Sequence, residues 1–264
     1  MRGSPVLWPG FLLHPIMALF TLHTFDYMPL VHLDIHHAEA QSALMRVMHS
    51  DYPVAVVQFP AVFALLAPST PLGVEALNDS KQRLNGKHYG SAIGSLKDFA
   101  ALADKAYLPS AFHSDIDSMR ALEGAFIRLK VTQPDFGSAA VTRGTHQGLL
   151  LPEGPHRKLF CMIEQEFQMQ SGNPLFDGAR YFAPLCTSAN ISGDTAGSIL
   201  DFERAMTFAE QRNLQLLITS SNAAAQELGS YPIFAFEQNT VRIMRHGPSQ
   251  ERILHALPSS ITLL

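Results

Sequence analysis

The chain has 264 residues, of which 47% are hydrophobic and 16% are charged, and its formal net charge is −4. The composition supplies enough apolar side chains for a core and excludes a disordered chain. The acidic balance excludes a protein that coats nucleic acid through its overall charge, although it permits a local basic pocket. Cys161 and Cys186 have no CxxC spacing, so the sequence predicts neither disulfides nor a zinc site and favours a reducing compartment.

Residues 1–35 are interpreted as an N-terminal extension, followed by one domain at 36–264. The apolar run at 12–20 contains Pro15 and is too short to span a bilayer, so no membrane association is expected. A secretory signal would need a stronger basic start than Arg2 and a small-residue cleavage site. We therefore expect a cytoplasmic protein, and an organelle-targeted or secreted form through residues 1–35 stays the alternative.

Hydrophobic periodicity and turn residues predict the secondary structure in chain order. Helices are predicted over 36–48, 74–83, 96–106, 158–169 and 199–212. Strands are predicted over 54–59, 89–96, 125–131, 139–142, 183–187, 215–219, 232–236 and 240–244, with the last two paired as a hairpin. Helices and strands alternate, but the late strands are too close in sequence for parallel crossovers. The pattern therefore predicts an α/β fold with a mixed parallel and antiparallel sheet.

The loop Thr187-Ser188-Ala189-Asn190-Ile191-Ser192-Gly193 is the first candidate for a functional site. It follows a predicted strand and precedes a predicted helix. Its small hydroxyl and amide side chains let the backbone approach an anion closely, and Gly193 permits a positive φ. The same residue types are common in ordinary turns, so the loop alone leaves both interpretations open.

Two groups of cations are further candidates. Lys81-Gln82-Arg83 ends a predicted helix, and its two cations can grip oxygens of a polyphosphate from different sides. The alternative is a solvated helix C-terminus, where the helix dipole favours cations. Arg245 ends the last predicted strand, where an arginine can lie over a ligand pocket or on the plain surface.

Other polar clusters give weaker indications. His32 and His36 would share one face of a helix at a spacing that metals can use, but no third ligand is evident, so no metal site is expected. Glu164 and Glu166 are interpreted as the polar face of a helix. The sequence contains no GxSxG, HExxH or P-loop motif.

The order of these motifs resembles the YrdC/YciO family, which includes the threonylcarbamoyl-adenylate synthases. The resemblance covers roughly 36–254, and its most specific element is the segment 184–193, which reads P-L-C-T-S-A-N-I-S-G. It implies a twisted, mixed sheet flanked by helices around a concave, positively charged groove. It also implies synthesis of threonylcarbamoyl-AMP from bicarbonate, L-threonine and ATP, with release of pyrophosphate. The product feeds the threonylcarbamoyladenosine modification of tRNA, and some relatives handle carbamoyl-adenylate instead.

The resemblance also implies roles for individual residues. Lys81 and Arg83 would neutralise the phosphates and the charge that develops at the α-phosphorus, and magnesium would accompany ATP. The nucleotide would be bound by Thr187, Ser188, Asn190 and Arg245. The amino acid would be bound by Arg143 and Ser230.

The sequence departs from the family pattern on the threonine side of the pocket. Where the family reads P-T-(D/E)-T-V-Y-G-L, this chain reads F-P-A-V-F-A-L-L over 59–66, so both threonines are missing. Two interpretations therefore stay open beside a scaffold that has neither activity. The first is an enzyme that makes threonylcarbamoyl-AMP or a related carbamoyl-adenylate. The second is a degenerate, non-catalytic protein that binds a nucleotide or RNA, such as tRNA or double-stranded RNA.

Overall fold

The computed structural model describes residues 29–82, 87–132, 138, 141–169, 172–221 and 227–264. Its strands are Val31–Asp34 (β1), Ala55–Phe59 (β2), Val62–Ala67 (β3), Gly90–Ala92 (β4), Ala125–Lys130 (β5), Thr145–Leu150 (β6), Leu185–Ser188 (β7), Leu216–Thr219 (β8), Ile233–Glu237 (β9), Thr240–Arg245 (β10) and Thr262–Leu263 (β11). Its helices are Ala40–Met48 (α1), Pro71–Lys81 (α2), Leu96–Ala101 (α3), Ser110–Ser114 (α4), Pro155–Phe167 (α5), Phe202–Gln211 (α6) and Gln250–Ala256 (α7). Two 3-10 helices cover Ile116–Leu122 (η1) and Pro174–Phe176 (η2). None of the described helices is long and apolar enough to cross a membrane.

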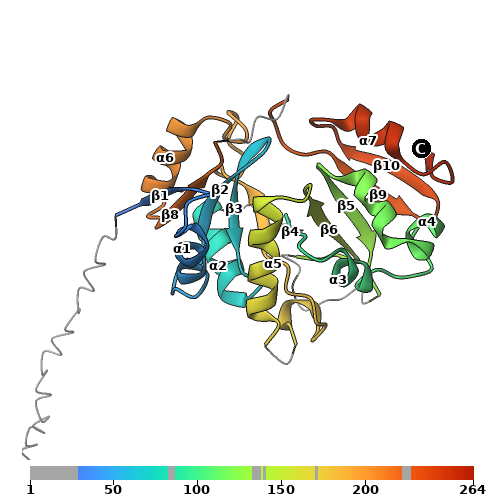
Figure 1. The fold of residues 1–264 in the computed structure, drawn as a ribbon, viewed down its shortest axis with the longest axis horizontal. Coiled ribbons are helices and arrows are strands. Elements are labelled where there is room, and N and C mark those ends of the chain that lie inside the picture. Colours follow the sequence, from blue (N-terminus) through green and yellow to red (C-terminus); the bar gives the residue numbers. More distant parts are fainter. Residues whose placement is uncertain (1–28, 83–86, 133–137, 139–140, 170–171, 222–226) are drawn as a thin grey trace, which may run out of the picture.

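One mixed sheet organises the described part of the chain (Figure 1). Its 11 strands lie in the order β1-β8-β2-β3-β7-β4-β6-β5-β9-β10-β11. The pairs β1·β8, β2·β8, β4·β6, β5·β9 and β10·β11 are parallel, and the others are antiparallel. The predicted α/β fold with a mixed sheet is therefore confirmed.

The predicted strand at 139–142 is wrong at Val141 and Thr142, which the structure describes outside any strand. The antiparallel partner of β5 is β6, in a register that joins Ala125 to Leu150 and Lys130 to Thr145. Residues 139–140 lie outside the described part of the chain. Pairing with β5 determines that residues 145–150 form the strand. The short apolar run at 139–142 gave no indication of a pairing partner.

Besides β6, three strands were not predicted, namely β1, β3 and β11. β3 follows β2 after a turn at Pro60 and Ala61, and the two strands pair from Phe59↔Val62 to Ala55↔Leu66. β1 lies beside β8 and falls inside the segment interpreted as an extension. The sheet therefore begins at Val31, and the boundary at residue 35 was placed too late.

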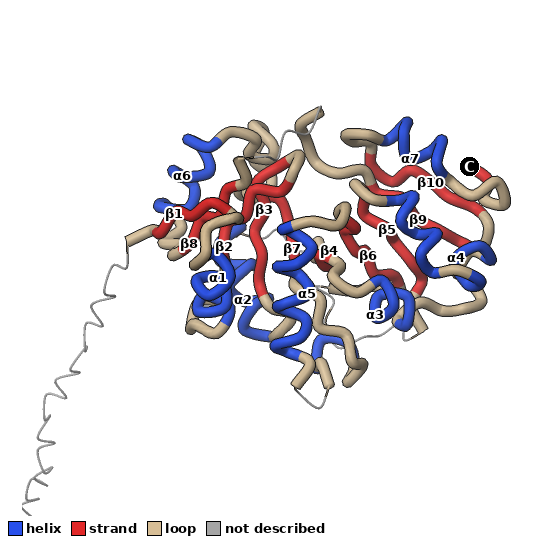
Figure 2. Tube along the Cα trace, viewed as in Figure 1, coloured by secondary structure: helices blue, strands red, loops and turns tan. Residues whose placement is uncertain are grey.

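Helices cover the two halves of the sheet differently (Figure 2). Around β2 and β3, α1 and α5 pack on one face, while α2 and α6 pack on the other. Around β5 and β9, buried side chains such as Ile127 and Phe234 meet α3, η1 and α7 on one face. The opposite face carries Arg128 and Ala235, which line an open groove. The candidate site lies where the helical cover on this face ends.

Helix α2 places Lys81 at the site. Thr70 caps its N-terminus by accepting a hydrogen bond from the Gly73 amide at 3.1 Å, and Pro71 occupies the first turn, where no amide donor is needed. The helix ends because Gln82 adopts a left-handed conformation, with φ of 47°. Lys81 is therefore the last helical residue and is only 2% exposed.

Glu164 does not lie on a polar helix face, so that interpretation was wrong. It is 3% exposed, and its two carboxylate oxygens accept hydrogen bonds from the Gly94 and Ser95 amides at 2.9 Å. The carboxylate thus joins α5 to the start of α3. Burial raises its pKa from the ordinary 4.5 to about 7, although the two amide donors act in the opposite direction.

This raised pKa predicts a pH-dependent stability. The folded protein binds the Glu164 proton more tightly than the unfolded chain, so stability falls as pH rises from about 4.5 to about 7. Glu164→Gln cannot titrate. The free energy of unfolding of the variant minus that of the wild type should therefore increase by about 3 kcal/mol as the pH rises across this range.

Urea denaturation of both proteins at several pH values measures this difference. Other buried titratable groups, such as His146, are shared by the two proteins and cancel. A difference that stays constant with pH would contradict the prediction.

Candidate functional site

A cavity of about 320 Å³ opens on the incompletely covered face of the sheet. Its size lies within the range of about 300–1,000 Å³ that is usual for small-molecule sites. Its described lining includes three cationic side chains, Lys81, Lys87 and Arg245, and no aspartate or glutamate. The cavity is therefore suited to an anionic ligand.

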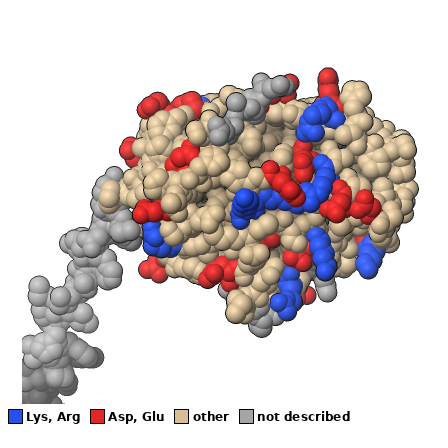
Figure 3. All heavy atoms as spheres, in the orientation of Figure 1, with Lys and Arg blue, Asp and Glu red and all other residues tan. Residues whose placement is uncertain are grey.

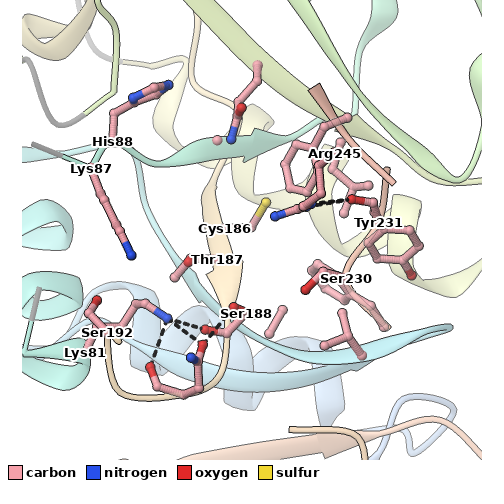
Figure 4. Close-up of a pocket in the computed structure, with 18 of the residues that line it drawn as sticks. Lys81, Lys87, His88, Cys186, Thr187, Ser188, Ser192, Ser230, Tyr231 and Arg245 are labelled. Carbon is pink, nitrogen blue, oxygen red and sulfur yellow. Dashed lines mark hydrogen bonds between the residues drawn. The ribbon is translucent and has the colours of Figure 1, made fainter. Parts of the chain in front are cut away.

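The Lys81 ammonium holds the loop that follows β7 (Figure 4). Its Nζ donates to the backbone oxygens of Ser188 and Asn190 at 2.6 and 2.9 Å, and to Oδ1 of Asn190 at 2.9 Å. In return, the Ser192 amide donates to the Lys81 carbonyl at 2.8 Å. An ammonium has three donors, so these contacts fix both the lysine and the turn.

The loop at 187–193 has the open, polar character that its sequence predicted. Ser188 Oγ donates to Asn190 Oδ1 at 2.8 Å, and Gly193 has a φ of 86°, as expected. Thr187 and Ser192 line the cavity. The Ser192 hydroxyl oxygen is buried and has no hydrogen-bond partner among the described residues. A buried hydroxyl without a partner is costly, so this atom is suited to receive a ligand.

Arg245 lies at the other end of the cavity. Its Nε and Nη2 donate to the Tyr231 carbonyl at 2.9 and 2.6 Å, and its guanidinium carbon lies 5.7 Å from the centre of the Phe126 ring. Nη1 makes no hydrogen bond within the described part of the chain. Burial lowers the pKa of Arg245, and the nearby Arg128 lowers it further. Such a partly desolvated cation is suited to bind an anion.

Ser230 also lines the cavity, next to Tyr231. Its hydroxyl lies 2.8 Å from the Ser198 hydroxyl, so the two side chains share a hydrogen bond. Figure 4 shows Ser230 on the same side of the cavity as Arg245, away from Lys81 and Lys87.

Two arginines predicted to contribute to the site need separate comment. Arg83 lies outside the described residues. Arg143 is exposed just before β6, and it lines a neighbouring groove rather than the cavity. The structure thus brings together Lys81, Thr187, Ser188, Asn190, Ser230 and Arg245, but not Arg143.

Arg128 lies next to the cavity, in the neighbouring groove, and the sequence did not identify it. Its Nη2 donates to Oε1 of Gln147, a cavity residue, at 2.6 Å, and its Nε is buried without a partner in the described residues. Burial lowers its pKa. Its signal was a cation in the middle of the apolar strand β5, where the neighbouring positions are Ile127 and Leu129.

The histidine cluster does not form a metal site. His32 lies on strand β1 rather than on a helix, and its Nε2 lies 2.8 Å from the Thr219 hydroxyl. The shared helix face with His36 was therefore a wrong expectation. The described residues contain no group of three or more His, Cys, Asp or Glu side chains that could hold a metal ion.

The cationic character of the cavity is local. In the orientation of Figure 1, acidic and basic side chains are mixed across the visible face (Figure 3). Arg120, for example, pairs with Asp117 at 3.1 Å and with Glu153 at 2.9 Å. The surface in this view therefore carries no extended patch of one charge sign, whereas the charged side chains that line the cavity are cations.

No family model and no curated protein matches the sequence. Solved structures do match its fold. A variant of Sua5 from P. abyssi aligns with a TM-score of 0.63 and 14% identity over 89% of this chain and 66% of that one. A hypothetical protein from Streptococcus mutans aligns with a TM-score of 0.61 and 13% identity over 89% of this chain and 97% of that one. E. coli YciO aligns with a TM-score of 0.54 and 15% identity over 84% of this chain and 96% of that one. These structures confirm the expected YrdC/YciO-like fold, and the chain spans 66% of the Sua5 chain.

Lys81 and Lys87 should respond differently to the same substitution. Lys81→Met leaves buried oxygens without donors, so the free energy of unfolding should fall by about 2–4 kcal/mol. Lys87 is exposed, and Lys87→Met should change it by less than about 0.5 kcal/mol. Urea denaturation followed by circular dichroism measures both values. Equal losses would show that Lys81 does not hold the loop.

Proposed function

We propose that the cavity binds ATP and transfers its AMP group to a carbamate made from bicarbonate and an amino acid. The product would be threonylcarbamoyl-AMP or a related carbamoyl-adenylate, and pyrophosphate would leave. The observation that carries the proposal is the attachment of buried Lys81 to Ser188 and Asn190, in a cavity whose described lining has no acidic side chain.

The loop end of the cavity is proposed to bind the phosphates. Thr187 and Ser192 offer hydroxyls, and Lys87 offers a cation from the segment before β4. Lys81 would act mainly by holding the loop in place and by adding positive charge beneath it. Arg83 keeps its proposed role toward the phosphates, on the basis of the sequence motif alone.

The reaction is an in-line substitution at the α-phosphorus. The free amine of the amino acid and bicarbonate give a carbamate and water. A carbamate oxygen then forms a bond to the α-phosphorus as the bond to pyrophosphate breaks. Cations around the phosphates stabilise the negative charge that builds up on the leaving oxygen.

Arg245, rather than Arg143, is proposed to bind the carboxylate of the amino acid, with Ser230 beside it and Arg128 adding positive charge nearby. The Arg245 guanidinium is partly desolvated, and no described carboxylate pairs with it. Solved structures with the same fold support ligands of both kinds. One is Sua5 complexed with L-threonine, and another is HypF in a phosphate- and nucleotide-bound form.

Magnesium is proposed to arrive with the nucleotide. The described cavity lining has no carboxylate, and Mg²⁺ in nucleotide sites takes much of its coordination from phosphate oxygens and water. Thr187 and Ser192 could complete that coordination through their hydroxyls. The carbamoyl-adenylate is proposed to serve tRNA modification.

Pyrophosphate release tests this function. The full chain, ATP, magnesium and bicarbonate should give release that depends on an added amino acid. Arg245→Met should lower kcat/KM for the amino acid on the order of 100-fold, because a charge-assisted contact is lost. Arg204→Met is the matched control, since Arg204 lies on the exposed surface of α6, and its rate should stay within about twofold. No release with any amino acid would contradict an enzymatic function.

A non-catalytic nucleotide- or RNA-binding protein is the second candidate. It is favoured by the groove beside the cavity. Among its described lining residues, the cations are Arg128, Lys130, Arg143 and Arg242, and Glu237 is the one acidic side chain. Four cations on an open sheet face are suited to a phosphate backbone.

RNA binding has a measurable signature. Affinity for a short RNA duplex, measured by fluorescence anisotropy, should fall steeply with salt. Arg143→Glu and Arg242→Glu should each reduce the slope of log affinity against log salt by about one. Affinity that is insensitive to salt or to both substitutions would exclude this groove as the RNA site.

A further inference from the structure

The cavity wall near Arg245 is apolar. Val62 and Ala64 of β3 line it together with Phe59 of β2 and Leu149 of β6. All four residues are at most 5% exposed, and they belong to one hydrophobic cluster. A ligand that reaches this wall therefore meets methyl groups and a ring.

The polar atoms near this wall already have partners. The Tyr231 hydroxyl accepts a hydrogen bond from the Ala61 amide at 3.1 Å, and the Ser230 hydroxyl shares one with Ser198. The Cys186 thiol is 2% exposed, and burial raises its pKa, so it stays neutral. A ligand hydroxyl placed against Val62 and Ala64 would lose its hydrogen bonds to water and meet apolar side chains instead.

Charge narrows the ligand further. Nη1 of Arg245, which lines the cavity, makes no hydrogen bond in the described chain. It can receive a carboxylate. Because no acidic side chain is among the described residues that line the cavity, a permanent ammonium group would be unpaired there. An amine that is consumed as a neutral carbamate nitrogen avoids this cost.

Building on the proposed function, we infer that the second substrate is an α-amino acid with an aliphatic side chain instead of a hydroxylated one. Its carboxylate lies toward Arg245, and its side chain lies against Val62 and Ala64. Valine and threonine test this, since they have nearly the same shape and differ in a methyl and a hydroxyl. A hydroxyl group in an apolar pocket is expected to weaken binding by about 10- to 100-fold.

The first experiment measures the binding of valine and threonine to the full chain by calorimetry, in the presence of bicarbonate and with and without ATP. Valine should bind about 10- to 100-fold more tightly than threonine. Threonine binding that is equal or tighter, or no binding of either amino acid, would overturn the inference. Pyrophosphate release is recorded separately. Preferential valine binding without release would contradict the proposed enzyme but leave the specificity intact.

The second experiment places a hydroxyl on the wall. Val62→Thr should reduce the preference for valine over threonine at least about fivefold, because the new hydroxyl can bond to that of threonine. The matched control is Val31→Thr, where the valine is 46% exposed on β1. The preference of the Val31→Thr variant for valine over threonine should match that of the wild type. A ratio of two affinities on one preparation does not depend on the folded fraction, and an unchanged ratio in Val62→Thr would rule out this wall.

Discussion

The Lys81 ammonium joins parts of the protein that are far apart in sequence. It ends α2 and binds the turn after β7, more than 100 positions later in the chain, at three oxygen atoms. A buried ammonium is tolerated only when its donors are satisfied, and a turn with outward-facing amides is stable only when its carbonyls have partners. Here the Lys81 ammonium supplies donors to the loop oxygens, and those oxygens supply acceptors to the ammonium. The polar loop can therefore face an open cavity without collapsing into the core.

The position of the cavity follows from how helices cover the sheet. β2 and β3 are buried on both faces, as their nearly continuous apolar sequence requires. β5 alternates instead, with Ile127 toward the core and Arg128 toward the open face. The site lies between the part of the sheet that is covered on both faces and the part that is covered on one. Apolar side chains and partly desolvated cations are neighbours there. Such a boundary lowers the effective dielectric around the arginines and strengthens their attraction for an anion.

Local patterns were enough to predict much of this arrangement. The segment at 184–193 indicated the polar turn, and the positive φ of Gly193 followed from the residue type. The late hairpin was evident because its two strands are adjacent in sequence. Pairings between distant segments were not predictable in this way. β6 was misplaced because its register is set by β5, and β1 was missed because only β8 stabilises it. Arg128 joined the site only through the neighbouring Gln147, and Glu164 became buried only through the packing of α5 on α3.

The turn at Pro60 and Ala61 has a consequence for how this pocket can diverge. Because β2 and β3 are joined by so short a connection, the register between them is rigid, and side chains alternate strictly between the two faces. Val62 and Ala64 face the cavity, whereas Phe63 and Leu65 fill the core on the other side. Exchanges at the two cavity positions can alter ligand preference while the core around Phe63 and Leu65 keeps its side chains. Insertion of a single residue would exchange the two faces and direct the Phe63 ring into the ligand space. Substitutions in β3 can therefore change the ligand specificity of the pocket, whereas insertions or deletions in this strand would disrupt it.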